Sequence, residues 1–336
     1  MEKMDRRRFL KISGSLAIGG ALLSVAGTGV WKMFTNPGEL FNGSKRTRGI
    51  KLLKEDGDFV SPYRRTFGFV TPDEMTAFEV EGGSIYVATP NNIYIYGMSG
   101  ELQSNFSIPS DLRDMVLFQG KIYALFATRV EVYDRSGEML QSWEACSENS
   151  DYCALAVCEA GVFVTDASNK NICKYHLDGT QARFINSPKG FVVPSYCFGI
   201  TAMDGKIYCS NPGRHQVESY TEEGDYITAF GEPGTGEGAF SGCCNPVYVV
   251  PANNGELLTS EKGIPRISCY SKEGKFRSVL LDSKALGGGH SAYEVRVMKD
   301  KLIVAGGDKV AVYQYNKNLS QQTQCGQCTE DCPLKI

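Results

Sequence analysis

The chain of 336 residues carries a formal net charge of −3 at pH 7, with 35 Lys or Arg residues against 38 Asp or Glu residues. This near balance gives no electrostatic basis for binding nucleic acid, so no nucleic-acid partner is expected. The composition includes 37 glycines, 13 prolines, 17 tyrosines and 17 phenylalanines. Such a composition is typical of short strands separated by tight turns, in one large all-β domain or two ordinary domains.

The first 31 residues are predicted to be an export segment. The letters RRRFLK at positions 6 to 11 precede an uncharged stretch rich in Gly and Ser. This pattern resembles a twin-arginine signal, with an ordinary basic N-terminal region as the alternative. The resemblance implies a periplasmic protein, or one at the outer face of the cytoplasmic membrane. The stretch is cleaved after Ala26 or stays as a membrane tether. Residues 32–60 are polar and charged, and we expect a linker there.

Residues 61–317 are repetitive. A Gly turn, a short strand, a polar turn, a second strand, another Gly turn and a third strand recur about every 37 to 50 residues. One more apolar strand precedes each copy, for example CALAVCEA or CFGITAMD. Four strands with this period are typical of a propeller blade, and six copies predict an all-β, six-bladed β-propeller. The segment YRRTFGF at 63–69 is expected to supply the outermost strand of the last blade and to close the ring.

Two stretches carry a family resemblance. FGEPGTGEGAFSGCCNPVYVV, from position 230, and VTDASNKNICKYHLDG, from position 164, resemble the NHL repeat of TolB-like propellers. The copy at 301–315 departs from the pattern, because it lacks the Asp-x-x-Asn turn. The resemblance implies the fold and selects no function, since such propellers serve both as enzymes and as binding platforms.

Cysteines recur at one register position of successive repeats. Eight residues before two of the turn glycines stand Cys153 and Cys197, the fifth repeat has Cys243 and Cys244 there, and His290 lies near the equivalent place in the sixth. These positions begin the innermost strands, which surround the mouth of a propeller's channel. Because thiolate and imidazole are ligands for soft and borderline metals, the five residues are a candidate metal site.

Disulfides and inert buried thiols are the alternatives for these cysteines. In an exported protein with an even number of cysteines, Cys153 could pair with Cys197, Cys146 or Cys158. The neighbours Cys243 and Cys244 could pair with each other only under strain. Three more cysteines fall within strands and are expected to be core residues: Cys173, Cys209 and Cys269.

Residues 318–336 form a Cys-rich tail. The order Cys325-x2-Cys328-x3-Cys332 followed by Pro333 resembles the end of the bacterial ferredoxin run C-x2-C-x2-C-x3-C-P. Gln322 stands where that run has its first cysteine, so a four-iron cluster would need a ligand from elsewhere. The spacing predicts an iron–sulfur cluster or another bound metal, with a disulfide and one spare thiol as the alternative. Two separate metal features are favoured over one site shared with the mouth.

The patterns together predict an exported propeller with a Cys-ligated metal or iron–sulfur centre. It would act in electron transfer or assembly of a redox complex, with a redox partner or membrane-complex protein. No H-E-x-x-H, P-loop, G-x-S-x-G or dinucleotide motif occurs in a usable context, so no catalytic residue is assigned and an enzyme is not favoured. The second reading is a non-catalytic binding platform with structural disulfides.

The third reading is a calcium-dependent lactonase- or lyase-type enzyme. It rests on a resemblance to six-bladed lactonases, which hold calcium with carboxylates and Asn at the channel, and it would use Glu74, Asn245 and Asp166. Further charged residues are expected on loops of the mouth face, where they form ordinary polar turns or an anion or sugar site: Asp166, Arg214, Glu261, Lys262 and Arg266.

Overall fold

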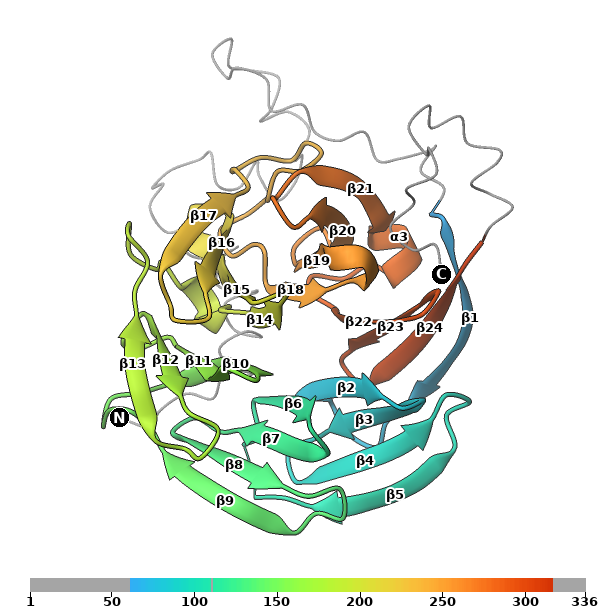
Figure 1. Cartoon of the computed structure of the whole chain (residues 1–336). Helices are drawn as coiled ribbons and strands as arrows, with labels where there is room; N and C mark the ends of the chain where they lie inside the picture. Colours follow the sequence, from blue (N-terminus) through green and yellow to red (C-terminus); the bar gives the residue numbers. More distant parts are fainter. Residues whose placement is uncertain (1–60, 110, 317–336) are drawn as a thin grey trace, which may run out of the picture. The chain divides into compact units, whose positions relative to one another are not determined.

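The computed structural model describes residues 61–109 and 111–316, and it confirms the six-bladed β-propeller (Figure 1). The strands form six antiparallel four-stranded sheets arranged in a ring. The predicted export segment and linker, together with the Cys-rich tail, lie outside the described residues. Among those described, no helix has the length and apolar character needed to cross a membrane.

Five blades use four consecutive strands each. Blades 1 to 3 contain β2 Ala77–Glu81, β3 Ser84–Ala88, β4 Asn92–Gly97 and β5 Leu102–Ser107; β6 Asp114–Phe118, β7 Lys121–Leu125, β8 Arg129–Tyr133 and β9 Met139–Glu144; β10 Tyr152–Cys158, β11 Gly161–Asp166, β12 Asn171–Tyr175 and β13 Gln181–Ile185. Blades 4 and 5 contain β14 Ile200–Met203, β15 Lys206–Asn211, β16 Gln216–Thr221 and β17 Tyr226–Phe230; β18 Tyr248–Pro251, β19 Glu256–Glu261, β20 Arg266–Ser271 and β21 Phe276–Leu281.

Blade 6 joins the two ends of the described chain. It contains β22 Glu294–Met298, β23 Lys301–Gly306 and β24 Lys309–Tyr315, and its outermost strand is β1 Tyr63–Val70. Strand β1 runs antiparallel to β24, with Tyr63 opposite Tyr315 and Val70 opposite Lys309. Short helical turns complete the elements: η1 Pro194–Tyr196, η2 Pro212–Arg214, η3 Asn253–Gly255 and α3 Ser283–Leu286.

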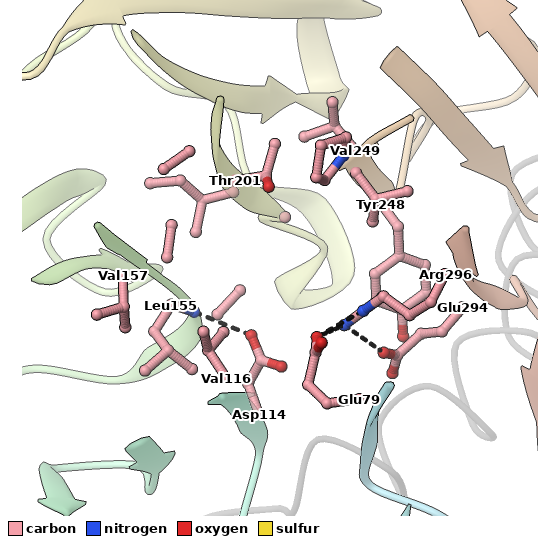
Figure 2. A pocket seen from close by; sticks show the side chains of 17 residues that line it. Glu79, Asp114, Val116, Leu155, Val157, Thr201, Tyr248, Val249, Glu294 and Arg296 are labelled. Carbon is pink, nitrogen blue, oxygen red and sulfur yellow. Dashed lines mark hydrogen bonds and ion pairs between the residues drawn. The ribbon is translucent and has the colours of Figure 1, made fainter. Parts of the chain in front are cut away.

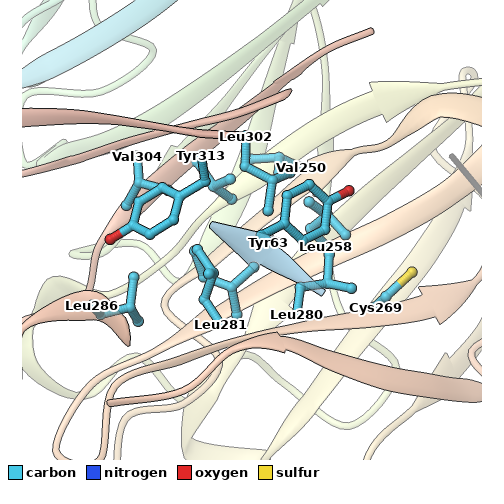
Figure 3. Packing of buried hydrophobic residues seen from close by; sticks show 12 residues of the cluster. Tyr63, Val250, Leu258, Cys269, Leu280, Leu281, Leu286, Leu302, Val304 and Tyr313 are labelled. Carbon is cyan, nitrogen blue, oxygen red and sulfur yellow. The ribbon is translucent and has the colours of Figure 1, made fainter. Parts of the chain in front are cut away.

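The core lies between the blades. Each of the six interfaces between neighbouring blades contains its own cluster of buried apolar side chains. The cluster between blades 5 and 6 is drawn in Figure 3, where Tyr63 of β1 packs among residues such as Leu258 and Leu302. Burial of these side chains is the main favourable term for holding one blade against the next.

One aromatic position recurs in every blade. The third strand of each blade carries a buried tyrosine at an equivalent place: Tyr96, Tyr133, Tyr175, Tyr220, Tyr270 and Tyr313. A side chain from the outermost strand of the preceding blade packs against several of these rings. Trp143 lies 5.8 Å from Tyr175 between ring centroids, and Phe230 lies 5.2 Å from Tyr270.

In blades 1 to 5 a glycine stands four residues after the tyrosine and makes this contact possible. Gly137 and Gly179 have φ values of +92° and +88°, which glycine adopts without the steric penalty of a Cβ. A Cβ at Gly179 would overlap the indole of Trp143, and one at Gly137 would lie 2.5 Å from Phe106. At Gly100 the nearby ring is Phe67 of β1, so blade 6 meets blade 1 through the same contact that joins blade 1 to blade 2 and blade 2 to blade 3.

We expect Gly179→Ala to destabilise the propeller more than Gly83→Ala. Gly83 has a similar φ of +85°, but nothing lies within 4 Å of its added Cβ. The control should therefore lose only the backbone term, about 1 kcal/mol. Gly179→Ala should lose about 1–3 kcal/mol more through overlap with Trp143. Denaturant unfolding of both variants measures the difference, and equal losses would contradict the proposed role of the contact.

Candidate functional site at the channel mouth

A pair of adjacent cysteines projects from the loop at 231–247, which connects β17 to β18. Cys243 is exposed, whereas Cys244 is only 2% exposed, and their sulfur atoms lie 3.0 Å apart. Gly242 precedes them with a φ of +71°. Seven cysteines of the described residues are present as thiols, and Cys243 is the only exposed one among them.

Asn245 attaches this loop to the neighbouring turn. Its buried side-chain amide donates to the carbonyl oxygens of Ser241 at 2.7 Å and Lys262 at 2.9 Å, and its carbonyl accepts from the backbone N–H of Lys262 at 2.9 Å. All of these bonds are made to backbone groups. The amide therefore holds the cysteine loop against the turn between β19 and β20.

A buried ion pair is hydrogen-bonded to the backbone of the same loop. Arg266 and Glu261 lie 2.5 Å apart, and both side chains are almost fully buried. Arg266 also donates to the carbonyl oxygen of Ala239, and Glu261 accepts from the backbone N–H of Ser241 at 3.4 Å. These two charged residues, which the sequence suggested as ligands for an anion or as polar turns, position the loop that carries the cysteines.

A second loop brings Cys197 to the same place. Ser195 of η1 has its Oγ 3.5 Å from the sulfur of Cys244, and the sulfur of Cys197 donates to the carbonyl oxygen of Ser195 at 3.5 Å. Ser195 and Tyr196 both adopt left-handed backbone conformations, with φ values of 56° and 54°. Such conformations in non-glycine residues cost about 1–3 kcal/mol each and are common at functional sites.

The other two residues of the predicted metal site, Cys153 and His290, have different surroundings. Cys153, at the start of β10, is buried in the core between blades 3 and 4, where its sulfur donates to the carbonyl oxygen of Asp151 at 3.7 Å. His290 is exposed, and its backbone carbonyl accepts from the N–H of Gly263 at 3.0 Å. Within the described ranges, no group of three or more His, Cys, Asp or Glu side chains is arranged to hold a metal ion. The mouth metal site stays a prediction, and the residues as arranged do not fit one.

Cys146 and Cys173 form a disulfide, the one found in the described part of the chain. Cys173 is fully buried, as expected for a core residue, but it is bonded rather than a thiol. Both residues belong to the core between blades 2 and 3. The pairing considered for Cys146, with Cys153, does not occur, because Cys153 packs on the other side of its blade, against blade 4.

The central channel contains a cavity of about 200 Å³ lined by the innermost strands (Figure 2). Arg296 lies 2.5 Å from Glu79 and 3.6 Å from Glu294, and Asp114 accepts from the backbone N–H of Leu155 at 2.9 Å. The remaining wall is largely apolar. Ligand pockets usually measure about 300–1,000 Å³, so this cavity is small for an organic substrate.

Sequence reasoning missed this ion-paired cluster in the channel. The available signal was the placement of charged residues inside otherwise apolar inner strands, as in AFEVE at 77–81 and EVRVM at 294–298. The pairing links blades 6 and 1, since Glu79 lies in β2 and Arg296 in β22.

Two of the three residues suggested for calcium, Asp166 and Asn245, hold the loops in which they lie. One carboxylate oxygen of Asp166 accepts from the backbone N–H groups of Asp151, Ser168 and Asn169, at 3.0–3.1 Å. The side-chain amide of Asn245 is already hydrogen-bonded to the backbone of Ser241 and Lys262. Because these two side chains hold loops of different blades, the structure offers no support for a shared calcium site.

Comparison with solved structures supports the fold. The chain is similar to virginiamycin B lyase from Staphylococcus aureus, with a TM-score of 0.55 and 13% sequence identity over 75% of this chain and 99% of the other. It is also similar to a streptogramin B lyase, with a TM-score of 0.55 and 13% identity over 76% and 97% of the two chains. At this identity the likeness shows the six-bladed propeller alone. No protein-family model and no curated protein matches the chain, so the NHL resemblance stays a prediction.

We expect Asn245→Ala to destabilise the protein by about 3 kcal/mol, because it leaves three partly buried backbone groups of Ser241 and Lys262 without this partner. The same change should release the loop and expose the thiol of Cys244 to alkylation. Asn105→Ala, on the exposed face of β5, is the matched control and should change neither property. Unfolding curves and peptide-mapped alkylation rates measure both effects. An Asn245→Ala variant with wild-type values for both would contradict the anchoring role.

The reactivity of Cys243 should depend on its neighbour. The hydrogen bond with Cys244 is the largest cause that raises the pKa of Cys243 above its usual value, followed by partial burial, while the charge of Lys262 opposes the shift. Cys244→Ala should therefore lower the pKa of Cys243 and increase its alkylation rate at pH 8 by roughly two- to tenfold. Lys262→Ala should act in the opposite direction. A slower reaction in Cys244→Ala would show that the neighbouring thiol activates Cys243.

Proposed function

We propose that this protein is an exported redox protein that works through cysteine sulfur at the outer face of the cytoplasmic membrane. The observation that carries the proposal is the contact between the exposed Cys243 and the buried Cys244, 3.0 Å apart on an anchored loop. A structural disulfide contains no exposed thiol, and an inert core thiol is buried. Cys243 differs from both, because its sulfur is accessible to a partner and lies against a second thiol with which it can form a bond.

The tail is proposed to hold the cofactor. Cys325, Cys328 and Cys332 lie outside the described residues, and their assignment rests on the ferredoxin-like spacing. An iron–sulfur cluster bound there would supply one-electron transfer. The missing fourth thiolate would come from a partner protein or another part of this chain. Both the redox partner and the location are proposals that rest on the cysteine pattern and on RRRFLK at 6–11.

A second candidate is a binding platform without redox chemistry. The disulfide between Cys146 and Cys173 favours it, because that bond has a structural position between two blades. On this reading the channel face would bind a protein or peptide, and Cys243 would be an accidental surface thiol.

Metal and acid-labile sulfide analysis of protein purified without oxygen separates these candidates. We expect iron and sulfide in the wild type, their loss in Cys325→Ser with Cys328→Ser, and their retention in the control Cys158→Ser. Iron retained in the tail variant and lost in Cys243→Ser with Cys244→Ser would move the centre to the mouth. Absence of iron and sulfide in every form, with no thiol that responds to redox reagents, would leave the binding platform.

A further inference from the structure

We infer that Cys243 and Cys244 form a dithiol–disulfide couple that exchanges with the disulfide of a thiol-containing partner. This inference rests on the proposed redox function and names its substrate class. Cys243 is the attacking residue, and Cys244 is the resolving residue. The pair lies in the described part of the propeller and needs no metal.

The division of roles follows from accessibility. A partner's disulfide can approach Cys243, whereas Cys244 is 2% exposed and can reach only what is already bound to Cys243. The sulfur of Cys244 lies 3.0 Å from that of Cys243, so the second step needs little movement. Cys197 is also almost fully buried, and Ser195 lies between it and Cys244 through contacts of 3.5 Å on each side.

The exchange balances as two displacements. The thiolate of Cys243 attacks one sulfur of the partner's disulfide, which forms a mixed disulfide and releases the first partner thiolate. The thiolate of Cys244 then attacks the sulfur of Cys243, which forms the bond between the two cysteines and releases the second partner thiolate. The protein loses two electrons and two protons, and the partner's disulfide gains both. The reverse sequence transfers the disulfide back to a partner dithiol.

Two nearby groups act on the thiolates. The hydrogen bond to Cys244 and partial burial raise the pKa of Cys243 above its usual value, and the positive charge of Lys262 opposes this shift. The hydroxyl of Ser195, 3.5 Å from the sulfur of Cys244, can donate a hydrogen bond to the thiolate that makes the second attack. Ser195 is held there by its left-handed backbone and acts as a positioning residue.

The bond between adjacent cysteines would be easily reduced. Consecutive Cα atoms across a trans peptide are about 3.8 Å apart, whereas disulfides usually join Cα atoms about 4.4–6.8 Å apart. The resulting strain makes such a bond more oxidising than a structural disulfide, and strained or exposed disulfides are the labile and catalytic ones. A readily reduced disulfide is what a couple needs in order to oxidise a partner dithiol.

Glutathione disulfide is a suitable probe, applied to the reduced full-length chain in which Cys325, Cys328 and Cys332 are replaced by serine. Intact mass and peptide mapping should show a disulfide within the peptide that contains Cys243 and Cys244, with no lasting glutathione adduct. Cys244→Ser should retain glutathione on Cys243, and Cys243→Ser should react at least tenfold more slowly. The half-buried Cys158→Ser is the control and should behave like its parent.

Other products would overturn the inference. A bond between Cys244 and Cys197, a glutathione adduct that persists on the parent, or an unchanged rate in Cys243→Ser each contradict the assigned roles. Thermal unfolding confirms that each variant is folded, and Cys244→Ala replaces Cys244→Ser if serine at this buried site unfolds the protein. The tail cysteines are absent from this experiment, so its outcome does not depend on an iron–sulfur cluster. A failed exchange reaction would therefore not contradict the iron analysis, and an absent cluster would not contradict the exchange reaction.

Discussion

The propeller depends on one repeated contact between neighbouring blades. A large side chain from the outermost strand of one blade packs over a glycine turn and a buried tyrosine of the next, as Trp143 does over Gly179 and Tyr175. The glycine is required because its φ is positive and because no space exists for a Cβ. Phe67 on β1 makes the same contact with Gly100 of the first blade, so the seam where the ring closes resembles the interfaces inside it.

A separate set of hydrogen bonds holds the cysteine loop in position. A loop of 17 residues, 231–247, would be mobile if only its ends were attached. Its own Asn245 is hydrogen-bonded to Lys262, and its backbone is hydrogen-bonded to the side chains of Glu261 and Arg266. Removing charges from water is costly, so a buried ion pair needs further bonds to the groups around it. Here the loop supplies these bonds through the backbone of Ala239 and Ser241. The result is an exposed sulfur in contact with a buried one, which in turn lies beside a serine of another loop.

Sequence reasoning predicted the architecture because the propeller repeats a short pattern. Gly turns at regular spacing define the blades, and alternating apolar residues identify the inner strands. The same register correctly placed Cys243 and Cys244 before β18 and Cys197 before β14. It could not show which sulfurs meet, because that depends on side-chain direction and on the path of long loops. The bond between Cys146 and Cys173 and the pairing of Glu79 with Arg296 are contacts between distant segments, which spacing does not encode.

The most direct test of the sulfur chemistry is a pair of crystal structures of the full chain, one reduced and one oxidised with glutathione disulfide. The account predicts separate sulfur atoms at Cys243 and Cys244 in the reduced crystal and a bond between them in the oxidised one. It also predicts that Cys197 and Ser195 keep their positions. Two separate sulfurs in both crystals, or a bond from Cys244 to Cys197, would contradict the account.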